Sequence, residues 1–184
     1  MKKFLELLDS MYIDYEIQDG AVVVQEQLVI NELGGVGPIS IPENTDFEFG
    51  FICHDSDIEI QLPENLKVAY ILDLTKTNVT RLPSNLTIYD DCYVYLDAHK
   101  IENVSYSANC GNNKRTIFAF WANDDFLIAA GCFTGTYSEF ERRVNEKYDD
   151  TTEASVYKRK ARGCISRLAK KLGKPDPFKK VTAK

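Results

Sequence analysis

The feature that most constrains the fold is a short peptide that recurs after twenty residues. Leu62–Val68 reads LPENLKV, Leu82–Ile88 reads LPSNLTI, and a shorter copy, IPEN, occupies 41–44. A fixed period of this length is typical of solenoids, in which each repeat buries its apolar edge against its neighbours. The repeats therefore predict a surface that holds a partner, in preference to a pocket for chemistry.

Short strands are expected between the repeats. Apolar and polar residues alternate over 47–49, 58–60, 71–74 and 93–96, which is the pattern of a half-buried β-strand. One such strand in each repeat, stacked in parallel, predicts a β-solenoid from about residue 39 to 105. The recurring asparagines are interpreted as structural, with side chains that hydrogen-bond the turn backbone of their own repeat: Asn44, Asn65 and Asn85. The alternative is that they form a ladder that binds a ligand.

The segments that flank the repeats predict caps. An amphipathic helix is expected over 2–12, where it would cover the first open edge of the solenoid. A hairpin should follow, because Asp19-Gly20 supplies the positive φ angles of a tight turn. After the repeats, two apolar strands joined across residues 123–125 predict a closing hairpin.

Two helices are expected at the C-terminal end. Thr136 and Glu139 have the spacing of a capping box, which predicts the start of a helix of about ten residues. A second apolar stripe at helical spacing predicts a helix over 153–172, ended by Gly173.

These elements predict an α+β fold, namely a short leucine-rich-repeat-like β-solenoid with an N-terminal capping helix and a C-terminal hairpin plus two helices. The expected capped solenoid spans 1–135, and a helical segment with a basic tail spans 136–184. Within the first part, the N-terminal helix and hairpin occupy 1–38, the repeats 39–105, and the closing hairpin 106–135.

Two stretches resemble known sequences. Leu72–Leu86 resembles the short leucine-rich repeats that end in Leu-Pro in bacterial effectors, although Thr77 stands where those repeats have a buried Asn. Ile128–Val144 contains GCFTGT followed by Glu139-Phe140, and this tail behind LPxNL repeats resembles uncharacterised bacteriophage and prophage proteins. The resemblance implies a bacteriophage origin and brings no agreed activity.

Charge is divided unevenly along the chain. Residues 157–184 contain eleven Lys and Arg and one acid, a net charge of +10, whereas the remaining residues contain eleven bases and 27 acids, a net charge of −16. Such a division favours electrostatic partnering, either within the molecule or with another one. One hypothesis is therefore a nucleic-acid-associated protein that binds phosphates through its basic helix, with the contacts Lys158, Arg159, Arg162, Arg167, Lys170 and Lys171. The alternatives are a helix that docks on the acidic part of the chain, or a solvated face.

The leading hypothesis is a non-enzymatic, phage-encoded protein in the cytoplasm of a bacterial host cell. It would engage a host protein and modulate or inhibit it, and the implied origin makes an anti-defence, anti-CRISPR-like role one form of this function. Aromatic anchors and acidic residues that mimic a phosphate backbone would supply the contacts. The expected partner-binding residues are Tyr70, Tyr89, Tyr93, Tyr95, Asp73, Asp90 and Asp91.

Catalysis, metals and cofactors are not expected. Cys132 between Gly131 and Gly135 is the most plausible nucleophile, but a thiol needs a base, and the only histidines, His54 and His99, lie in the repeats. The five cysteines are scattered without metal-ligand spacing, so they are predicted to be reduced core residues. No apolar run is long enough to span a bilayer, so no membrane partner is expected. The oligomeric state is left open.

Overall fold

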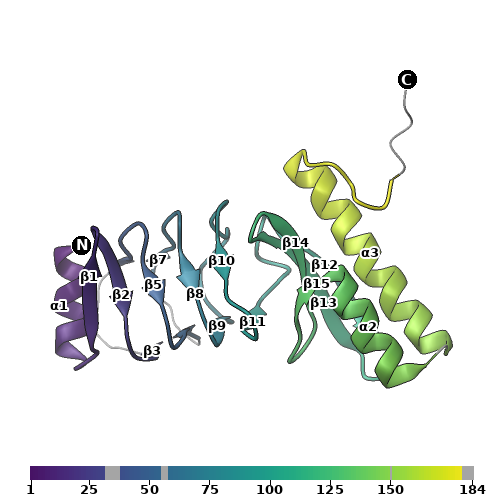
Figure 1. The fold of residues 1–184 in the computed structure, drawn as a ribbon, viewed down its shortest axis with the longest axis horizontal. Coiled ribbons are helices and arrows are strands. Elements are labelled where there is room, and N and C mark those ends of the chain that lie inside the picture. Colours follow the sequence, from purple (N-terminus) through teal and green to yellow (C-terminus); the bar gives the residue numbers. More distant parts are fainter. Residues whose placement is uncertain (32–37, 55–57, 150, 180–184) are drawn as a thin grey trace. The chain divides into compact units, whose positions relative to one another are not determined.

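The computed structural model describes residues 1–31, 38–54, 58–149 and 151–179. Within them the chain forms three helices and fifteen strands, and it divides into two compact units (Figure 1). The first unit contains Met1–Glu102 and Ala122–Asp124, and the second contains Asn103–Trp121 and Asp125–Lys184. The hairpin that was predicted to close the repeats thus lies mostly in the second unit, whereas the predicted division falls at residue 135.

The first unit contains a five-stranded mixed sheet. Its first two strands form an antiparallel hairpin, as expected, with Asp19 and Gly20 at φ angles of 49° and 82° in the turn. The other strands follow in parallel. In spatial order the strands are β1 (Tyr15–Gln18), β2 (Ala21–Val24), β5 (Asp46–Phe47), β8 (Lys67–Val68) and β10 (Thr87–Ile88).

A second sheet of this unit is wholly parallel. Its strands, in spatial order, are β11 (Tyr93–Leu96), β9 (Ile71–Leu74), β6 (Phe51–Cys53) and β3 (Leu28–Ile30). Two further short strands, β4 (Ile39–Ser40) and β7 (Ile60–Gln61), pair with each other in parallel. The strands predicted over 71–74 and 93–96 are confirmed by β9 and β11.

The core of the first unit contains buried side chains from the repeats and from the N-terminal helix. Phe47 and Phe51 stack with ring centroids 4.8 Å apart, and Phe4 meets Phe47 edge-on at 6.4 Å. Phe4 belongs to helix α1 (Lys2–Ser10), which buries Phe4 and Leu8. Side chains from successive repeats, such as Leu66 and Leu86, are also buried.

The predicted solenoid with one strand in each repeat is wrong. The repeat region contributes short strands to three different sheets, one of them mixed, so the fold is α+β with parallel, mixed and antiparallel sheets and three helices. The physical reason is that the backbone turns several times within each repeat. Asn44 and Asn65 have φ angles of 61° and 57° and lie two residues before β5 and β8, and Tyr70 has a φ of 57° two residues after β8. These left-handed residues border strands of only two residues.

Among the recurring asparagines, the side chain of Asn85 bonds to turn backbone of the preceding repeat. Asn85 Oδ1 accepts a hydrogen bond from the backbone N–H of Asn65 at 2.7 Å, and Asn85 Nδ2 donates to Asn65 Oδ1. Asn44 donates its backbone N–H to the Glu64 carbonyl at 3.3 Å. For Asn65 and Asn85 the expectation that each side chain serves its own repeat is therefore corrected.

The second unit packs two helices on an antiparallel sheet. The strands, in spatial order, are β12 (Ser105–Cys110), β13 (Arg115–Ala122), β14 (Asp125–Ala129) and β15 (Thr134–Thr136). The predicted capping box is confirmed, because Thr136 Oγ1 accepts from Glu139 N–H while Glu139 Oε2 accepts from Thr136 N–H at 2.8 Å. This box starts α2 (Tyr137–Tyr148), and α3 (Thr152–Leu172) ends at Gly173 with a φ of 66°.

The core of the second unit confirms the apolar stripe that predicted α3. The stripe lies against the inward face of the sheet and against Phe140 and Val144 of α2, and its buried members are Tyr157, Ala161, Cys164, Ile165 and Leu168. Among the described residues, none of the helices combines the length and the apolar character needed to cross a membrane.

Candidate functional site

The outer face of the parallel sheet carries aromatic and aliphatic side chains. Tyr93 lies in register with Ile71, and Tyr95 and Ile52 both lie in register with Asp73. Because alternate residues of a strand point to opposite faces, these five side chains share the side opposite buried Leu72 and Val94. We call this group, Ile52, Ile71, Asp73, Tyr93 and Tyr95, the β9–β11 face.

A stacked aromatic pair adjoins this face at the start of the strands. Phe49 and Tyr70 lie just before β6 and β9, with ring centroids 5.7 Å apart and planes 5° from parallel. Their side chains are 46% and 61% exposed, so the stack is offered to solvent. Gly50 makes this arrangement possible, because its φ is 111° and a Cβ there would meet Ile71 Cγ2 at 2.6 Å.

The four predicted partner-binding tyrosines do not all gather at this place. Tyr70 and Tyr93 are exposed there, and Tyr95 is half-buried on the same face. Tyr89 instead follows β10 of the mixed sheet, where its hydroxyl donates to Asp46 Oδ2 at 2.8 Å. Burial, and then the hydrogen bond to Asp46, raise the pKa of Tyr89 to about 12.

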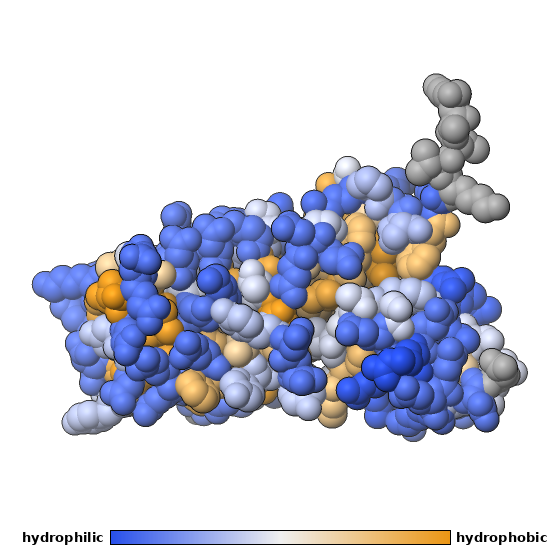
Figure 2. Space-filling view, viewed as in Figure 1, coloured by the Kyte–Doolittle hydropathy of each residue, from blue (hydrophilic) through white to orange (hydrophobic). Residues whose placement is uncertain are grey.

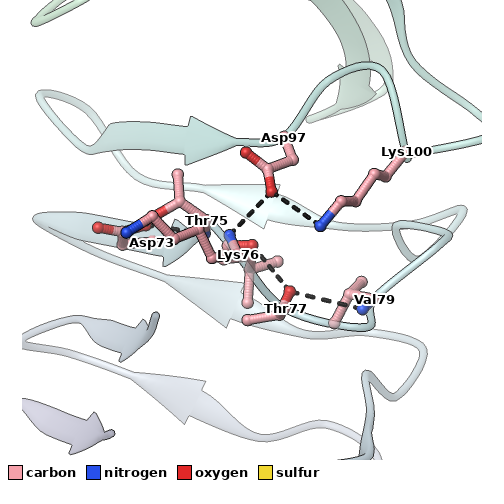
Figure 3. A network of polar contacts seen from close by, with 8 residues as sticks. Asp73, Thr75, Lys76, Thr77, Val79, Asp97 and Lys100 are labelled. Atoms are coloured by element: carbon pink, nitrogen blue, oxygen red, sulfur yellow. Dashed lines mark hydrogen bonds and ion pairs between the residues drawn. The ribbon is translucent and has the colours of Figure 1, made fainter. Parts of the chain in front are cut away.

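The predicted acidic residues have different roles. Asp73 Oδ1 accepts from the Thr75 N–H at 2.9 Å and from the Thr75 hydroxyl at 2.7 Å, so this carboxylate stabilises the turn after β9 (Figure 3). Asp90 and Asp91 are exposed in the turn before β11. Asp73 Oδ2 also lies 3.6 Å from His54 Nδ1, so this carboxylate is engaged within the first unit. Asp90 and Asp91 come shortly before Tyr93 in the chain.

The turn after β9 contains Thr77, at the position where the leucine-rich repeats that this segment resembles have a buried asparagine. Thr77 is buried, and its hydroxyl donates to the Leu74 carbonyl at 2.8 Å and accepts from the Val79 N–H at 3.4 Å (Figure 3). Asp97, one repeat further on, accepts from the Lys76 N–H at 2.9 Å and pairs with Lys100 at 3.2 Å. Polar side chains therefore link successive repeats at this corner of the first unit.

Most of the side chains that were predicted to contact nucleic acid form hydrogen bonds with other residues of the second unit. Arg167 donates to the Tyr106 carbonyl at 2.9 Å and to Ser105 and Ser107 hydroxyls, and Lys171 donates to the Val104 carbonyl at 2.8 Å. These bonds fasten α3 to β12 and the residue before it.

The other half of α3 is fastened to α2 in the same way. Lys158 donates to Asn145 Oδ1 at 2.8 Å, and Arg162 donates to the Tyr137 hydroxyl at 2.7 Å and to Glu141 at 3.1 Å. Of the six predicted contacts, Arg159 and Lys170 are exposed and have no such bond to the described residues. Phosphate binding by the other four would compete with bonds that hold the unit together.

The second unit also contains a cavity that the sequence did not indicate as a binding site. It has a volume of about 300 Å³, and its walls include Arg115, Cys132, Phe133, Arg143, Lys147 and Tyr148. Cys132, the candidate nucleophile, is exposed at this cavity, but no histidine or carboxylate belongs to the lining. Four separated segments supply the lining, so no local motif could have revealed it.

On the face shown in Figure 2 hydrophilic residues predominate, and hydrophobic ones are seen near α1 and β1 of the first unit and beside α3 of the second. Comparisons with protein-family models, curated proteins and solved structures give no match for this chain. The resemblance to phage proteins therefore stays a prediction.

Proposed function

We propose that this chain is a non-enzymatic, phage-encoded binding protein that engages and modulates a host protein in the bacterial cytoplasm. The observation that carries the proposal is the group of aromatic rings on the first unit: the Phe49–Tyr70 stack beside Tyr93 and Tyr95 of the β9–β11 face. Exposed tyrosines are the side chains on which binding energy is most often concentrated in protein interfaces.

The aromatic group is held in place before any partner arrives. Tyr93 and Tyr95 project from a paired strand, and the stack restrains both Phe49 and Tyr70. Rings that are already ordered lose little conformational entropy on binding, which favours affinity.

Charge defines the kind of host protein that would fit. The first unit contains six Lys and Arg against twenty Asp and Glu, a net charge of −14, and Asp90 and Asp91 lie close to the aromatic residues in the chain. A partner with an apolar groove bordered by basic residues would be complementary to this surface. Host defence proteins that handle nucleic acid have such basic surfaces, and inhibition of one of them is the form of the function that we favour.

The test is a pull-down from nuclease-treated bacterial lysate with the double variant Tyr70→Ala/Tyr93→Ala. The wild-type chain should retain a host protein in a fixed ratio, and the double variant should lose at least about tenfold in affinity for the purified partner, as expected when two aromatic anchors are truncated. Tyr106→Ala is the matched control, because Tyr106 of the second unit is 43% exposed and Tyr93 is 44% exposed. Equal retention by the double variant, or retention of a partner only from lysate that was not treated with nuclease, would contradict the proposal.

A further inference from the structure

The cavity of the second unit is surrounded by three cationic side chains from different elements. Arg115 is the first residue of β13, and Arg143 and Lys147 lie one turn apart on α2. The Arg115 guanidinium lies over Gly131, where a Cβ would come within 3.1 Å of Nη1. Gly131 has a φ of 64° in the turn closed by the Ala130 N–H and the Phe133 carbonyl, and its missing side chain leaves room for the guanidinium.

None of the three cations has a carboxylate within ion-pair distance in the part of the chain that the structure describes. The neighbouring Arg142 differs, because it pairs with Glu146 at 2.8 Å. Hydrogen bonds from Thr136, and to a smaller extent the charge of Arg143, lower the pKa of Glu139. Glu139 Oε2 accepts from the Thr136 N–H and hydroxyl, both at 2.8 Å. The three positive charges are thus not held in ion pairs, which favours an anion between them.

Aromatic rings form much of the remaining wall. Phe133 lies under the Arg143 guanidinium with the carbon 5.7 Å from the ring centroid, and Tyr148 lies 5.4 Å from Lys147 Nζ. Tyr148 also stacks on Tyr157 with centroids 5.2 Å apart. A planar ring in the cavity would meet both cation-bearing and aromatic surfaces.

One wall residue of the cavity, Tyr157, is almost completely buried. Tyr157 lines the cavity with 3% of its surface exposed, and its hydroxyl has no hydrogen-bond partner among the described residues. Burial, followed by the neighbouring Tyr148, raises the pKa of Tyr157 to about 12, so near neutral pH the hydroxyl keeps its proton. The hydroxyl lies against Gly111, where an added Cβ would come within 2.5 Å of it, so the cavity is defined by its cations and rings.

We propose that this cavity binds a phosphate monoester that carries a planar base, the chemistry of a nucleoside monophosphate. The phosphate would lie between Arg115, Arg143 and Lys147, and the base would lie against Phe133 or Tyr148. Guanidinium groups match phosphate oxygens in pairs, and about 300 Å³ is at the lower end of the volumes of small-molecule sites. A free mononucleotide and the 5′-phosphate end of a nucleic-acid strand present the same chemistry.

The experiment is a calorimetric titration of the full chain with AMP, adenosine, inorganic phosphate and a short oligonucleotide with or without a 5′-phosphate. AMP should bind one to one, and adenosine and inorganic phosphate should each bind at least about tenfold more weakly, because each lacks one of the two recognised parts. A 5′-phosphorylated oligonucleotide that binds as tightly as AMP would identify a strand end as the source, and a much weaker one would identify the free nucleotide.

Variants and a chemical probe locate the binding. Arg143→Gln should lose about tenfold or more in AMP affinity, and the adjacent control Arg142→Gln should keep it. Cys132 is the one exposed thiol of the five, so bound AMP should slow its alkylation by iodoacetamide. A folded wild-type chain that shows no AMP binding at millimolar concentration would overturn the proposal. Equal AMP affinity of Arg143→Gln and the wild type, with no protection of Cys132, would also overturn it.

Discussion

Asn85 and Asn65, twenty residues apart, form a two-bond link in which the Asn85 amide accepts from the Asn65 backbone and donates to the Asn65 side chain. The link joins two successive copies of the LPxN motif, and of the two asparagines Asn65 has the left-handed backbone, with a φ of 57°. It explains why the repeat keeps an amide at this position, since a single side chain satisfies both a backbone donor and a side-chain acceptor.

Replacement of Asn85 by Ala removes both bonds and should lower the free energy of unfolding by about 1 kcal/mol, because the link is solvent-exposed. Urea denaturation followed by circular dichroism measures this change. Gln61→Ala, at an exposed position of β7, is the control and should stay within about 0.5 kcal/mol of the wild type. If both variants unfold at the same urea concentration, the link adds nothing to stability.

Two glycines with left-handed backbone should differ in their tolerance of a methyl group. Gly50→Ala places a Cβ 2.6 Å from Ile71 Cγ2 and should cost more than about 2 kcal/mol. Gly20→Ala has open space around the new methyl, so only backbone strain of about 1 kcal/mol is expected. Thermal melting of the two purified variants would compare them, and a lower melting temperature for Gly20→Ala would contradict the packing argument at Ile71.

Arg167 fastens α3 to β12, so Arg167→Met should destabilise the second unit by about 1–2 kcal/mol. Trp121, the only tryptophan, belongs to this unit, so its fluorescence follows the relevant unfolding transition. Arg159→Met is the matched control, since Arg159 is an exposed cation of the same helix. The role assigned to Arg167 fails if the two variants have the same transition midpoint.

Because the pKa of Tyr89 is raised in the folded state, the free energy of unfolding should decrease at alkaline pH. The folded state holds this proton to about pH 12, whereas an unfolded tyrosine releases it near pH 10, so this contribution to stability is complete below pH 10 and is lost between pH 10 and 12. Tyr89→Phe should therefore lose less stability over that pH range than the wild type. Urea midpoints measured from pH 9 to 12 test this, and parallel curves for the two proteins would exclude a contribution from Tyr89.

Local chemistry made several elements predictable. Asp19-Gly20, the Thr136–Glu139 capping box and Gly173 each act within a few residues, and alternation alone located β9 and β11. Sheet membership was not predictable, because it depends on left-handed turns such as that at Tyr70, a residue type with no preference for positive φ. The period of the repeat was therefore real, although the fold class deduced from it was wrong.

The candidate sites were predictable to different degrees. Of the four tyrosines predicted as anchors, Tyr70 and Tyr93 are exposed on the β9–β11 side, and the sequence did not distinguish them from the other two. The sequence also could not show that Arg162 and Arg167 are bonded to their own unit. The cavity needs Arg115, Cys132 and Arg143, which come together only when β13, the β14–β15 turn and α2 pack. Long-range packing of this kind leaves no pattern in a single sequence.

The charge of this chain is divided along the same boundary as its two compact units. The first unit carries −14, and the second carries sixteen bases and eight acids, a net charge of +8. The overall isoelectric point of about 5.0 hides this division. On ion-exchange resins at neutral pH and low salt, the chain should consequently be retained by both positively and negatively charged matrices, behaviour that a uniformly acidic protein of the same isoelectric point would not show.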